Sequence, residues 1–479
     1  MYSHMLTSGI TIGFGGSAGL EAPIVITGSA IGSNIASFLG FGYKERTLLL
    51  ACGAASGIAA VFNSPIAGVI FAFEVLLTDI TIPVFIPLLI STATATILSK
   101  FLLKGQLFYL VTDDWYFSAI PFYVLLGILC GFISVYMTRV TLNVEGFFEK
   151  RKKILPKAII GGLALGILIF LFPPLFGEGY GTIETLLKGD GFNILKNSVF
   201  AFLPTSPWIL IAFTFLIILL KIIATSLTLG AGGNGGIFAP SLFTGGLTGF
   251  GTAFLVNTIG ISQLHVSNFI AVGMAGIMSG VVHAPLTAIF LIAEITGGYV
   301  LFVPLMIVSA LSFFISRYFE PYSIYTKKLV QKGHYFTGDK EGNVFKKLPI
   351  DELVETEFIA LNQNDTFSTL IDAFTRSKRN VFPVVDDDHN FIGIIPLENF
   401  KEFMFKSELY DELRLGDLTS KSVVTLEINE NMDDAMIKLE SSHLWNIPVT
   451  NKGKYIGFIS RANILSYYRR ILKKSGSLF

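Results

Sequence analysis

Two glycine-rich turns carry the chemistry that this sequence could perform. The first, Gly19–Pro23, has the sequence GLEAP, and the second, Gly236–Pro240, has the sequence GIFAP. An apolar run follows each turn, and a proline in the first helical turn is well tolerated because its missing N–H would lack an intrahelical partner. Free backbone N–H groups and the positive end of the helix dipole then face the turn. The sequence therefore predicts two helix starts that bind a small anion.

Glu21 is an acidic residue inside the first of these turns. A carboxylate at a helix N-terminus resembles a bound anion and gains about 0.3–1 kcal/mol from the helix dipole. A lone charge at membrane depth costs about 2.5–3.5 kcal/mol, so such residues are usually functional. We therefore predict that Glu21 acts together with Gly19, Ala22 and Gly236 at one anion site. A plain helix N-terminal acid is the alternative interpretation.

The composition indicates a membrane protein. Hydrophobic residues make up 52% of the 479 residues and charged residues only 15%, whereas soluble chains carry about a quarter charged residues. The formal net charge is zero, which gives no indication of a nucleic-acid partner. Charges are sparse before Tyr325 and dense after it. The two cysteines, Cys52 and Cys130, lie in apolar runs without disulfide or metal-binding spacing, so no metal site is predicted.

These patterns divide the chain into a membrane part, 1–332, a linker, 333–344, and a soluble part, 345–479. Apolar spans that approach the length needed to cross a bilayer are Ile82–Leu103, Ile120–Val140, Ala158–Phe172, Trp208–Ile223, Phe269–Val282 and Tyr299–Phe314. Shorter apolar spans, broken by glycine or proline, are Ala22–Phe38, Thr47–Val61 and Pro65–Leu77. Broken spans are tolerated only where protein or a water-filled cavity satisfies their loose backbone groups.

The distribution of charge in the loops predicts the orientation. The segment Lys150–Lys153 is strongly basic, and so is the exit at Lys327, Lys328 and Lys332, whereas Asp113–Asp114 is acidic. The positive-inside rule places the basic segments, and everything after them, in the cytoplasm. We therefore predict a multi-pass protein of a bacterial-type inner or plasma membrane with a cytoplasmic C-terminal part.

An internal repeat accompanies the two turns. Gly53–Glu74 and Gly273–Glu294 share a glycine-rich helix, a proline-started helix and a final glutamate at a constant offset, because 273 − 53 and 294 − 74 both equal 220. Two such halves can enclose one site at the bilayer midplane. Repetition alone leaves open whether the halves are parallel or inverted. The alternative is that small-residue helices simply pack closely in lipid.

With these motifs in view, residues 5–332 resemble the CLC family of chloride channels and chloride/proton exchangers. The motifs that carry the resemblance are Gly19–Pro23, Asn63–Gly68, Gly235–Pro240 and Ser323–Tyr325. The resemblance implies an all-α polytopic membrane domain with an inverted repeat and broken helices. It also implies a homodimer with one pathway per subunit for chloride or a similar anion.

The resemblance also assigns roles to single residues. Glu21 matches the family's gating glutamate, which occupies the outer anion site and swings away to admit chloride. Ile237 and Phe238 match the backbone amides of the central anion site, and Tyr325 matches the tyrosine whose hydroxyl donates to that anion. Without the motif, Tyr325 would be interpreted as a tyrosine of the membrane interface.

Three departures from the family pattern affect the functional interpretation. Leu20 and Ala22 replace the basic residue and the glycine usual beside the gating glutamate, so the outer mouth is expected to attract anions less strongly. Val75 follows Glu74 where exchangers commonly carry a second glutamate, which favours a channel over a proton-coupled antiporter. The family's first helices, with a serine that contacts the anion, do not precede Glu21, so we expect an N-terminally truncated chain.

The soluble part contains a second repeat, with copies at about 345–405 and 415–474. Each copy has a helical pattern followed by two strands around a turn, with strands expected at 380–385, 391–395, 445–450 and 455–459. The pattern resembles a pair of CBS motifs, α/β modules that often bind adenine nucleotides. Ser460 and Asn463 match nucleotide-contacting positions in the second copy, whereas the first copy has Pro396 and Asn399. Nucleotide binding and a purely structural dimerisation module both remain open.

Other chemistries are excluded by missing motifs. The six histidines are scattered, with no His-Glu-x-x-His helix, and no phosphate-binding loop or Ser/His/Asp arrangement is present, so no enzyme activity and no required cofactor are predicted. We predict anion transport gated by Glu21, with regulation by nucleotide at the CBS pair as an open question. The alternative is a non-conducting membrane scaffold or nucleotide sensor. A cation transporter is disfavoured because both helix N-termini direct positive charge at the ligand.

Overall fold

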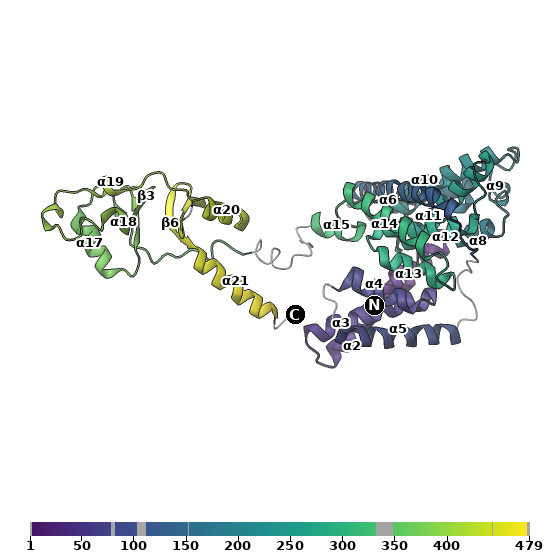
Figure 1. Cartoon of the computed structure of the whole chain (residues 1–479), viewed down its shortest axis with the longest axis horizontal. Coiled ribbons are helices and arrows are strands. Elements are labelled where there is room, and N and C mark those ends of the chain that lie inside the picture. The colour runs from purple at the N-terminus through teal and green to yellow at the C-terminus, as the bar shows by residue number, and fades with distance from the viewer. Residues whose placement is uncertain are drawn as a thin grey trace. The chain divides into compact units, whose positions relative to one another are not determined.

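The computed structural model describes residues 2–77, 82–102, 112–151, 153–331, 348–442 and 444–476. The chain forms two compact units, Met1–His334 and Tyr335–Phe479, the first helical and the second built from strands and helices (Figure 1). The predicted linker, 333–344, lies outside the described residues. The predicted boundaries of the membrane and soluble parts fall near the limits of these units and remain predictions.

Helices joined by turns make up the described residues of the first unit. Its α-helices are α1 (Tyr2–Gly13), α2 (Glu21–Phe38), α3 (Tyr43–Phe62), α4 (Pro65–Phe71), α5 (Ile82–Leu102), α6 (Ile120–Glu149), α7 (Ile154–Leu171), α8 (Tyr180–Leu187), α9 (Asn193–Lys196), α10 (Pro207–Gly230), α11 (Phe238–Ile259), α12 (Val266–Val282), α13 (Pro285–Ile295), α14 (Phe302–Phe319) and α15 (Ile324–Gln331). Short 3₁₀ turns are η2 (Phe117–Ala119) and η3 (Pro173–Leu175), and η1 (Ala72–Leu76) is a π-helix. Seven of the described helical segments are long and apolar enough to cross a membrane. The predicted membrane fold with interrupted helices is confirmed.

The internal repeat appears as two matching helix pairs. Helix α2 packs on α3, and α11 packs on α12, with glycines at both crossings. At the first crossing a Cβ atom on Gly28 or Gly53 would collide with the carbonyl group of the other, and Gly245 and Gly273 behave in the same way at the second. Figure 1 shows α2, α3 and α5 on one side of the unit and α10, α11 and α14 on the other, with α4 and α13 between them. The two halves meet where α4 contacts α13.

Each half contains the same sharp break between two helices. Asn63 directly follows α3 and His283 directly follows α12, and both residues adopt the left-handed conformation, with φ of 54° and 61°. A proline then starts the next helix, Pro65 in α4 and Pro285 in α13. Left-handed residues commonly terminate helices, and proline suits the first helical position. The break therefore has the same local cause in both halves.

The free N–H groups at these breaks are satisfied by the opposite half. Glu74 accepts hydrogen bonds from the Leu286 N–H (2.9 Å) and the Thr287 N–H (2.8 Å) at the start of α13. Glu294 accepts hydrogen bonds from the Ile66 N–H (3.1 Å) and the Ala67 N–H (2.9 Å) at the start of α4. The final glutamate of each repeat therefore caps the proline-started helix of the other. Charge-assisted bonds of this kind are among the stronger hydrogen bonds in proteins.

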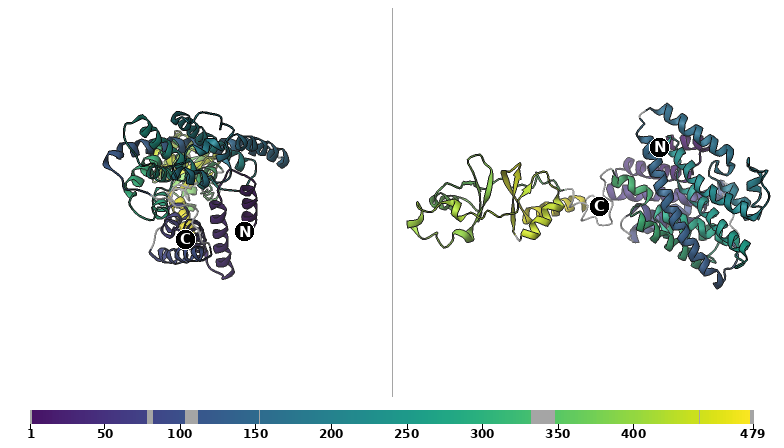
Figure 2. Two further views of the ribbon diagram at one scale, coloured as in Figure 1. Left: turned by 90° about the vertical axis from the view of Figure 1, so that its right-hand side faces the viewer. Right: turned by 90° about the horizontal axis from the view of Figure 1, so that it is seen from above.

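The second unit contains two three-stranded sheets. Its elements are β1 (Leu361–Asn362), α17 (Phe367–Arg376), β2 (Val381–Val385), β3 (Phe391–Pro396), α18 (Leu397–Phe400), η4 (Ser407–Leu409), α19 (Leu415–Leu418), β4 (Leu426–Glu427), α20 (Met432–Ser442), β5 (Asn446–Asn451), β6 (Lys454–Ser460) and α21 (Arg461–Gly476). The sheet orders are β1-β2-β3 and β4-β5-β6; in each, the first pair is parallel and the second antiparallel. Figure 2 shows the two sheets as separate halves of this unit. The predicted strands are confirmed to within one residue at each end.

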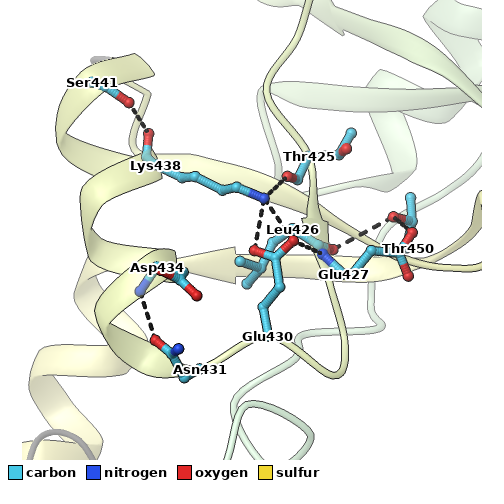
Figure 3. A network of polar contacts seen from close by, with 9 residues as sticks. All are labelled: Thr425, Leu426, Glu427, Glu430, Asn431, Asp434, Lys438, Ser441 and Thr450. Atoms are coloured by element: carbon cyan, nitrogen blue, oxygen red, sulfur yellow. Dashed lines mark hydrogen bonds and ion pairs between the residues drawn. The ribbon is translucent and has the colours of Figure 1, made fainter.

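A polar network fastens α20 to the sheet of the second copy (Figure 3). The Lys438 ammonium donates to the Thr425 carbonyl (2.9 Å) and to both oxygens of Glu430. Glu427 accepts from the Thr450 hydroxyl (3.0 Å) and from the Lys452 N–H (3.1 Å). These hydrogen bonds hold the pKa of the Glu427 carboxyl below its usual value. These contacts thus connect the loop between β4 and α20 to α20 and connect β4 to β5.

Removal of one interhelical cap is expected to destabilise the membrane unit. Glu74→Ala leaves the Leu286 and Thr287 N–H groups without their acceptor, which is expected to cost about 1–3 kcal/mol. The measurement is the thermal unfolding midpoint of the purified protein in detergent, which is expected to fall. Glu294→Ala is expected to lower it similarly because it performs the same role in the other half.

The matched control is Glu184→Ala, since Glu184 is exposed and pairs only with Lys188 on its own helix. Exposed pairs of this kind contribute about 0–1 kcal/mol. Equal midpoints for Glu74→Ala, Glu294→Ala and the control would contradict the capping role.

Candidate functional site

The two glycine-rich turns contact each other directly. The Gly19 N–H donates to the Gly236 carbonyl and the Gly236 N–H donates to the Gly19 carbonyl, each at 2.8 Å. This antiparallel bridge joins residues that are 236 − 19 = 217 positions apart and places the starts of α2 and α11 beside each other. The structure therefore places the two helix N-termini next to each other.

Both glycines of the bridge are required by close packing. A Cβ atom on Gly19 would collide with the Glu21 carboxylate and with Ala239, and a Cβ atom on Gly236 would collide with Ala22. Ala22, predicted as an anion-site residue, therefore faces the opposite turn. Since backbone atoms of the two turns approach this closely, any side chain at either glycine would separate them.

Glu21 begins α2 and is almost completely buried, with 2% of its surface exposed. Its Oε1 atom accepts a hydrogen bond from the Tyr180 hydroxyl at 2.6 Å. Its Oε2 atom is buried without a hydrogen bond in the described part of the chain, although the Ala239 N–H lies near enough to attract it. The carboxylate therefore lies at the start of its own helix and beside the start of α11.

Ile237 and Phe238 occupy the positions expected of them at the start of α11. Both are buried, with 4% and 3% of their surface exposed, and the Phe238 ring lies 5.5 Å from the ring of Phe62. The first four N–H groups of a helix lack intrahelical partners. No acidic residue lies in the first turn of α11. An anion could therefore bind here without a competing carboxylate from α11 itself.

Tyr325 lies near the start of α15 and close to Glu21 in space. Its residue surface is 38% exposed, but its hydroxyl is near enough to the Glu21 carboxylate for the two groups to interact electrostatically. Ion pairs hold α15 in place, because Lys327 pairs with Glu320 and Lys328 pairs with Glu145. Two predicted site residues that are 304 positions apart are thus brought together; their roles remain predictions.

Lys221 is a charged residue near the site that the sequence analysis did not select. It lies in α10 with none of its surface exposed, and its ammonium donates to the carbonyls of Gly177 (2.7 Å) and Leu175 (3.3 Å). It also lies 4.8 Å above the Phe243 ring centre. A single lysine within an otherwise apolar span is a functional signal that could have revealed it. Lys221 therefore fastens the segment that contains Leu175 and Gly177 to α10.

Glu178 and Tyr180 are two further residues that were missed. They lie in the glycine-rich segment Gly177–Gly181, and Glu178 accepts a hydrogen bond from the Leu20 N–H at 3.0 Å. Glu178 is also attracted by the Lys221 ammonium. Both residues line a pocket of about 560 Å³. An acid flanked by glycines was the available signal, but its distance from Glu21 in the sequence concealed the relationship.

The predicted nucleotide-contacting residues of the second unit hold segments of the same chain. The Ser460 hydroxyl donates to Glu355 Oε1 at 2.6 Å, and Arg379 donates to Glu355 Oε2 at 2.6 Å. The Asn463 amide donates to the Leu353 carbonyl at 2.9 Å. A carboxylate therefore takes the hydrogen bond that Ser460 could offer to a phosphate.

Comparison with known proteins identifies both units. The family described as "Voltage gated chloride channel" matches residues 1–317, and the CBS domain matches residues 350–406 and 415–470. Chloride channel protein CLC-e of Arabidopsis thaliana is 27% identical over 449 residues, which cover 82% of this chain and 61% of that protein. The H(+)/Cl(-) exchange transporter ClcA of Vibrio cholerae serotype O1 is 31% identical over 315 residues, which cover 62% of each chain. The chain thus spans about three fifths of the length of these relatives.

A solved structure shares the fold. A slow cyanobacterial Cl-/H+ antiporter superimposes with a TM-score of 0.56 at 24% identity, over 67% of this chain and 73% of that chain. At this identity the likeness concerns the fold alone.

The closeness of the two turns generates a prediction. Gly236→Ala introduces a Cβ atom that collides with Ala22 and is expected to lower the stability of the membrane unit by about 1–3 kcal/mol through overpacking. The control is Gly251→Ala in the same helix, where a Cβ atom would make only ordinary contact with Thr214 at 3.7 Å. That substitution is expected to stabilise by up to about 1 kcal/mol because alanine is the better helix former. Thermal unfolding in detergent measures both; equal effects would show that the turns tolerate a side chain.

Proposed function

Because this chain belongs to the voltage gated chloride channel family, we propose that it moves chloride or a similar small anion across a membrane, with Glu21 as its gate. The observation that carries this proposal is the position of the Glu21 carboxylate, buried where the starts of α2 and α11 are joined by the Gly19–Gly236 bridge. Paired helix N-termini bind anions through free N–H groups and the helix dipole. A carboxylate at this point competes with a diffusible anion for the same positive field.

The gate is expected to respond to protonation. An ionised Glu21 is held by the Tyr180 hydroxyl and repels a second anion, whereas a protonated Glu21 loses its charge and its attraction for the helix N-termini. Anion flux is therefore expected to rise as the pH falls. The start of α11, with Ile237 and Phe238, and the Tyr325 hydroxyl remain the proposed central anion site.

A channel-like mechanism is favoured over proton-coupled exchange. Val75 occupies the place where a second acid would be needed, and it is a half-buried side chain packed against the apolar core. The adjacent Glu74 is engaged with N–H groups of α13. Names of similar proteins include both a channel and an exchanger, so this part of the proposal rests on Val75 and Glu74 alone.

The test is chloride efflux from proteoliposomes with simultaneous recording of external pH. We expect wild-type efflux that rises on acidification without accompanying proton uptake. Glu21→Gln is expected to retain efflux and lose its pH dependence, since the gate no longer titrates, while Glu184→Gln serves as the control. Efflux accompanied by proton uptake would show that the protein is an exchanger and not a channel. Absence of efflux would favour the non-conducting scaffold or sensor.

We further propose that an adenine nucleotide binds the second unit, in the cytoplasm, in competition with Glu355. The support is that Ser460 and Arg379 both donate to the Glu355 carboxylate and would be free to bind a phosphate if it were displaced. Glu355→Gln weakens these bonds and is expected to raise nucleotide affinity about tenfold, measured by calorimetry on the full chain with ATP. The control is Glu357→Gln, an exposed neighbour. If neither variant released or absorbed heat on addition of ATP, the proposal of nucleotide binding would be wrong.

A further inference from the structure

Glu178 lies between a pocket and the buried Glu21 carboxylate. The pocket of about 560 Å³ is lined by residues that include Ile12, Phe176, Glu178, Tyr180 and Thr182, and Glu178 is the one charged side chain among its described lining residues. Glu178 is half-buried, whereas Glu21 is 2% exposed. Protons that reach Glu21 from this side must therefore cross the layer of side chains that Glu178 and Tyr180 form.

Tyr180 spans that layer. It lines the pocket and also donates its hydroxyl proton to Glu21 Oε1 at 2.6 Å. Glu178 is near enough to interact electrostatically with both the Tyr180 hydroxyl and the Glu21 carboxylate. Tyr180 is thus hydrogen-bonded to one carboxylate and lies near a second, and a phenol placed in this way can pass a proton from one to the other.

The loop that carries Glu178 is held in place by Lys221. The ammonium donates to the carbonyls of Leu175 and Gly177, directly before Glu178. Gly177 and Gly179 have φ of 58° and 93°, in the left-handed region, and a Cβ atom on Gly179 would collide with the Phe243 ring. The position of Glu178 is therefore fixed by the fold rather than by a flexible loop.

The pocket is expected to open on the external side. Helix α7 (Ile154–Leu171) starts next to the basic segment Lys150–Lys153 and ends next to the pocket residue Pro173. Its 18 residues span about 27 Å, close to the thickness of the hydrocarbon core. If the basic segment is cytoplasmic, a single crossing places the pocket on the opposite side.

We propose that Glu178 passes protons between this external pocket and Glu21, with the Tyr180 hydroxyl as the link. This inference rests on the proposed function of Glu21 as a protonation-controlled gate. In the inward step a protonated Glu178 gives its proton to the Tyr180 oxygen as the Tyr180 hydroxyl proton moves to Glu21. Glu178 ends as a carboxylate, Tyr180 stays neutral and Glu21 ends protonated, so one proton is transferred without change in total charge. The reverse step releases the proton to the pocket.

Several charged or titratable groups face these residues, and they decide the design of the test. Glu178 is faced by Lys221 from α10, Glu21 from α2 and Tyr180 from α8, and Tyr325 from α15 faces Glu21. Loss of the Glu178 charge could therefore alter the proton affinity of Glu21 by electrostatics alone. A changed proton affinity of Glu21 alters the protonation equilibrium itself. It would therefore shift the response to external pH and the response to internal pH equally. Loss of a relay slows proton access from one side only.

The experiment compares Glu178→Gln with wild type by recording anion current in excised patches of both orientations, after a pH step on one side at a time. Glutamine still offers a carbonyl oxygen to the Leu20 N–H, so the loop is expected to keep its position. We expect the rate of current activation after external acidification to fall at least about tenfold, with the response to internal acidification unaltered. Tyr180→Phe is expected to slow the same external step, and Glu178→Asp to restore part of it. The control is Glu184→Gln, which changes an exposed acid in α8, the helix that begins at Tyr180.

The outcomes separate this inference from the proposed function. Equal shifts of the internal and external responses, or a pH response of Glu178→Gln identical to wild type, would overturn the relay and leave Glu21 as the gate. Wild-type current whose pH dependence survives Glu21→Gln, or no current at all, would overturn the proposed function and the relay with it. Thermal unfolding of each variant in detergent verifies that a slowed response does not come from misfolding.

Discussion

The exchange of carboxylates between the two halves of the membrane unit is the interaction on which the rest of the structure depends. Apolar helices that break inside a membrane leave N–H groups that lipid cannot satisfy. Glu74 supplies the acceptors for α13 and Glu294 supplies those for α4. Neither half satisfies its own broken helix, because the carboxylate that accepts hydrogen bonds from that helix comes from the other half. This mutual dependence places α4 against α13 and so fixes the arrangement in which the two glycine-rich turns meet.

The same requirement distinguishes the start of α11 from the other proline-containing helix starts. Four proline-containing helix starts occur in the two repeats, and three of them have a carboxylate from the chain: α4 and α13 through the exchange, and α2 through Glu21 within its own first turn. Helix α11 has no acid in its first turn, and its start lies beside Glu21 through the Gly19–Gly236 bridge. The N–H groups and the positive dipole at this start therefore face no acid from α11 itself. Of the three carboxylates, Glu21 also lies beside a second helix start.

Two further ionisable residues, Glu178 and Lys221, lie in the part of the fold next to Glu21. Burial of a single ion at membrane depth is costly, so ions there are paired or bound by hydrogen bonds. Lys221 is solvated by two backbone carbonyls and attracted by Glu178, and Glu178 in turn accepts the Leu20 N–H. Through Glu178, the buried lysine is thus linked to the turn that contains Leu20.

The sequence by itself determined the local features: the two turns, the proline-started helices, the apolar spans and the four longer strands of the second unit. These depend on neighbours in the chain, since glycine, proline and hydrophobic spacing act within a few residues. Glu21 stood out for the same reason, as a lone acid in a helix-starting turn. Only the tertiary structure decided that Glu74 and Glu294 cap opposite halves, and that Tyr180 bonds to Glu21 across 159 positions. Such partners are chosen by how helices pack and which buried groups lack hydrogen bonds, and neither is encoded at a fixed spacing along the chain.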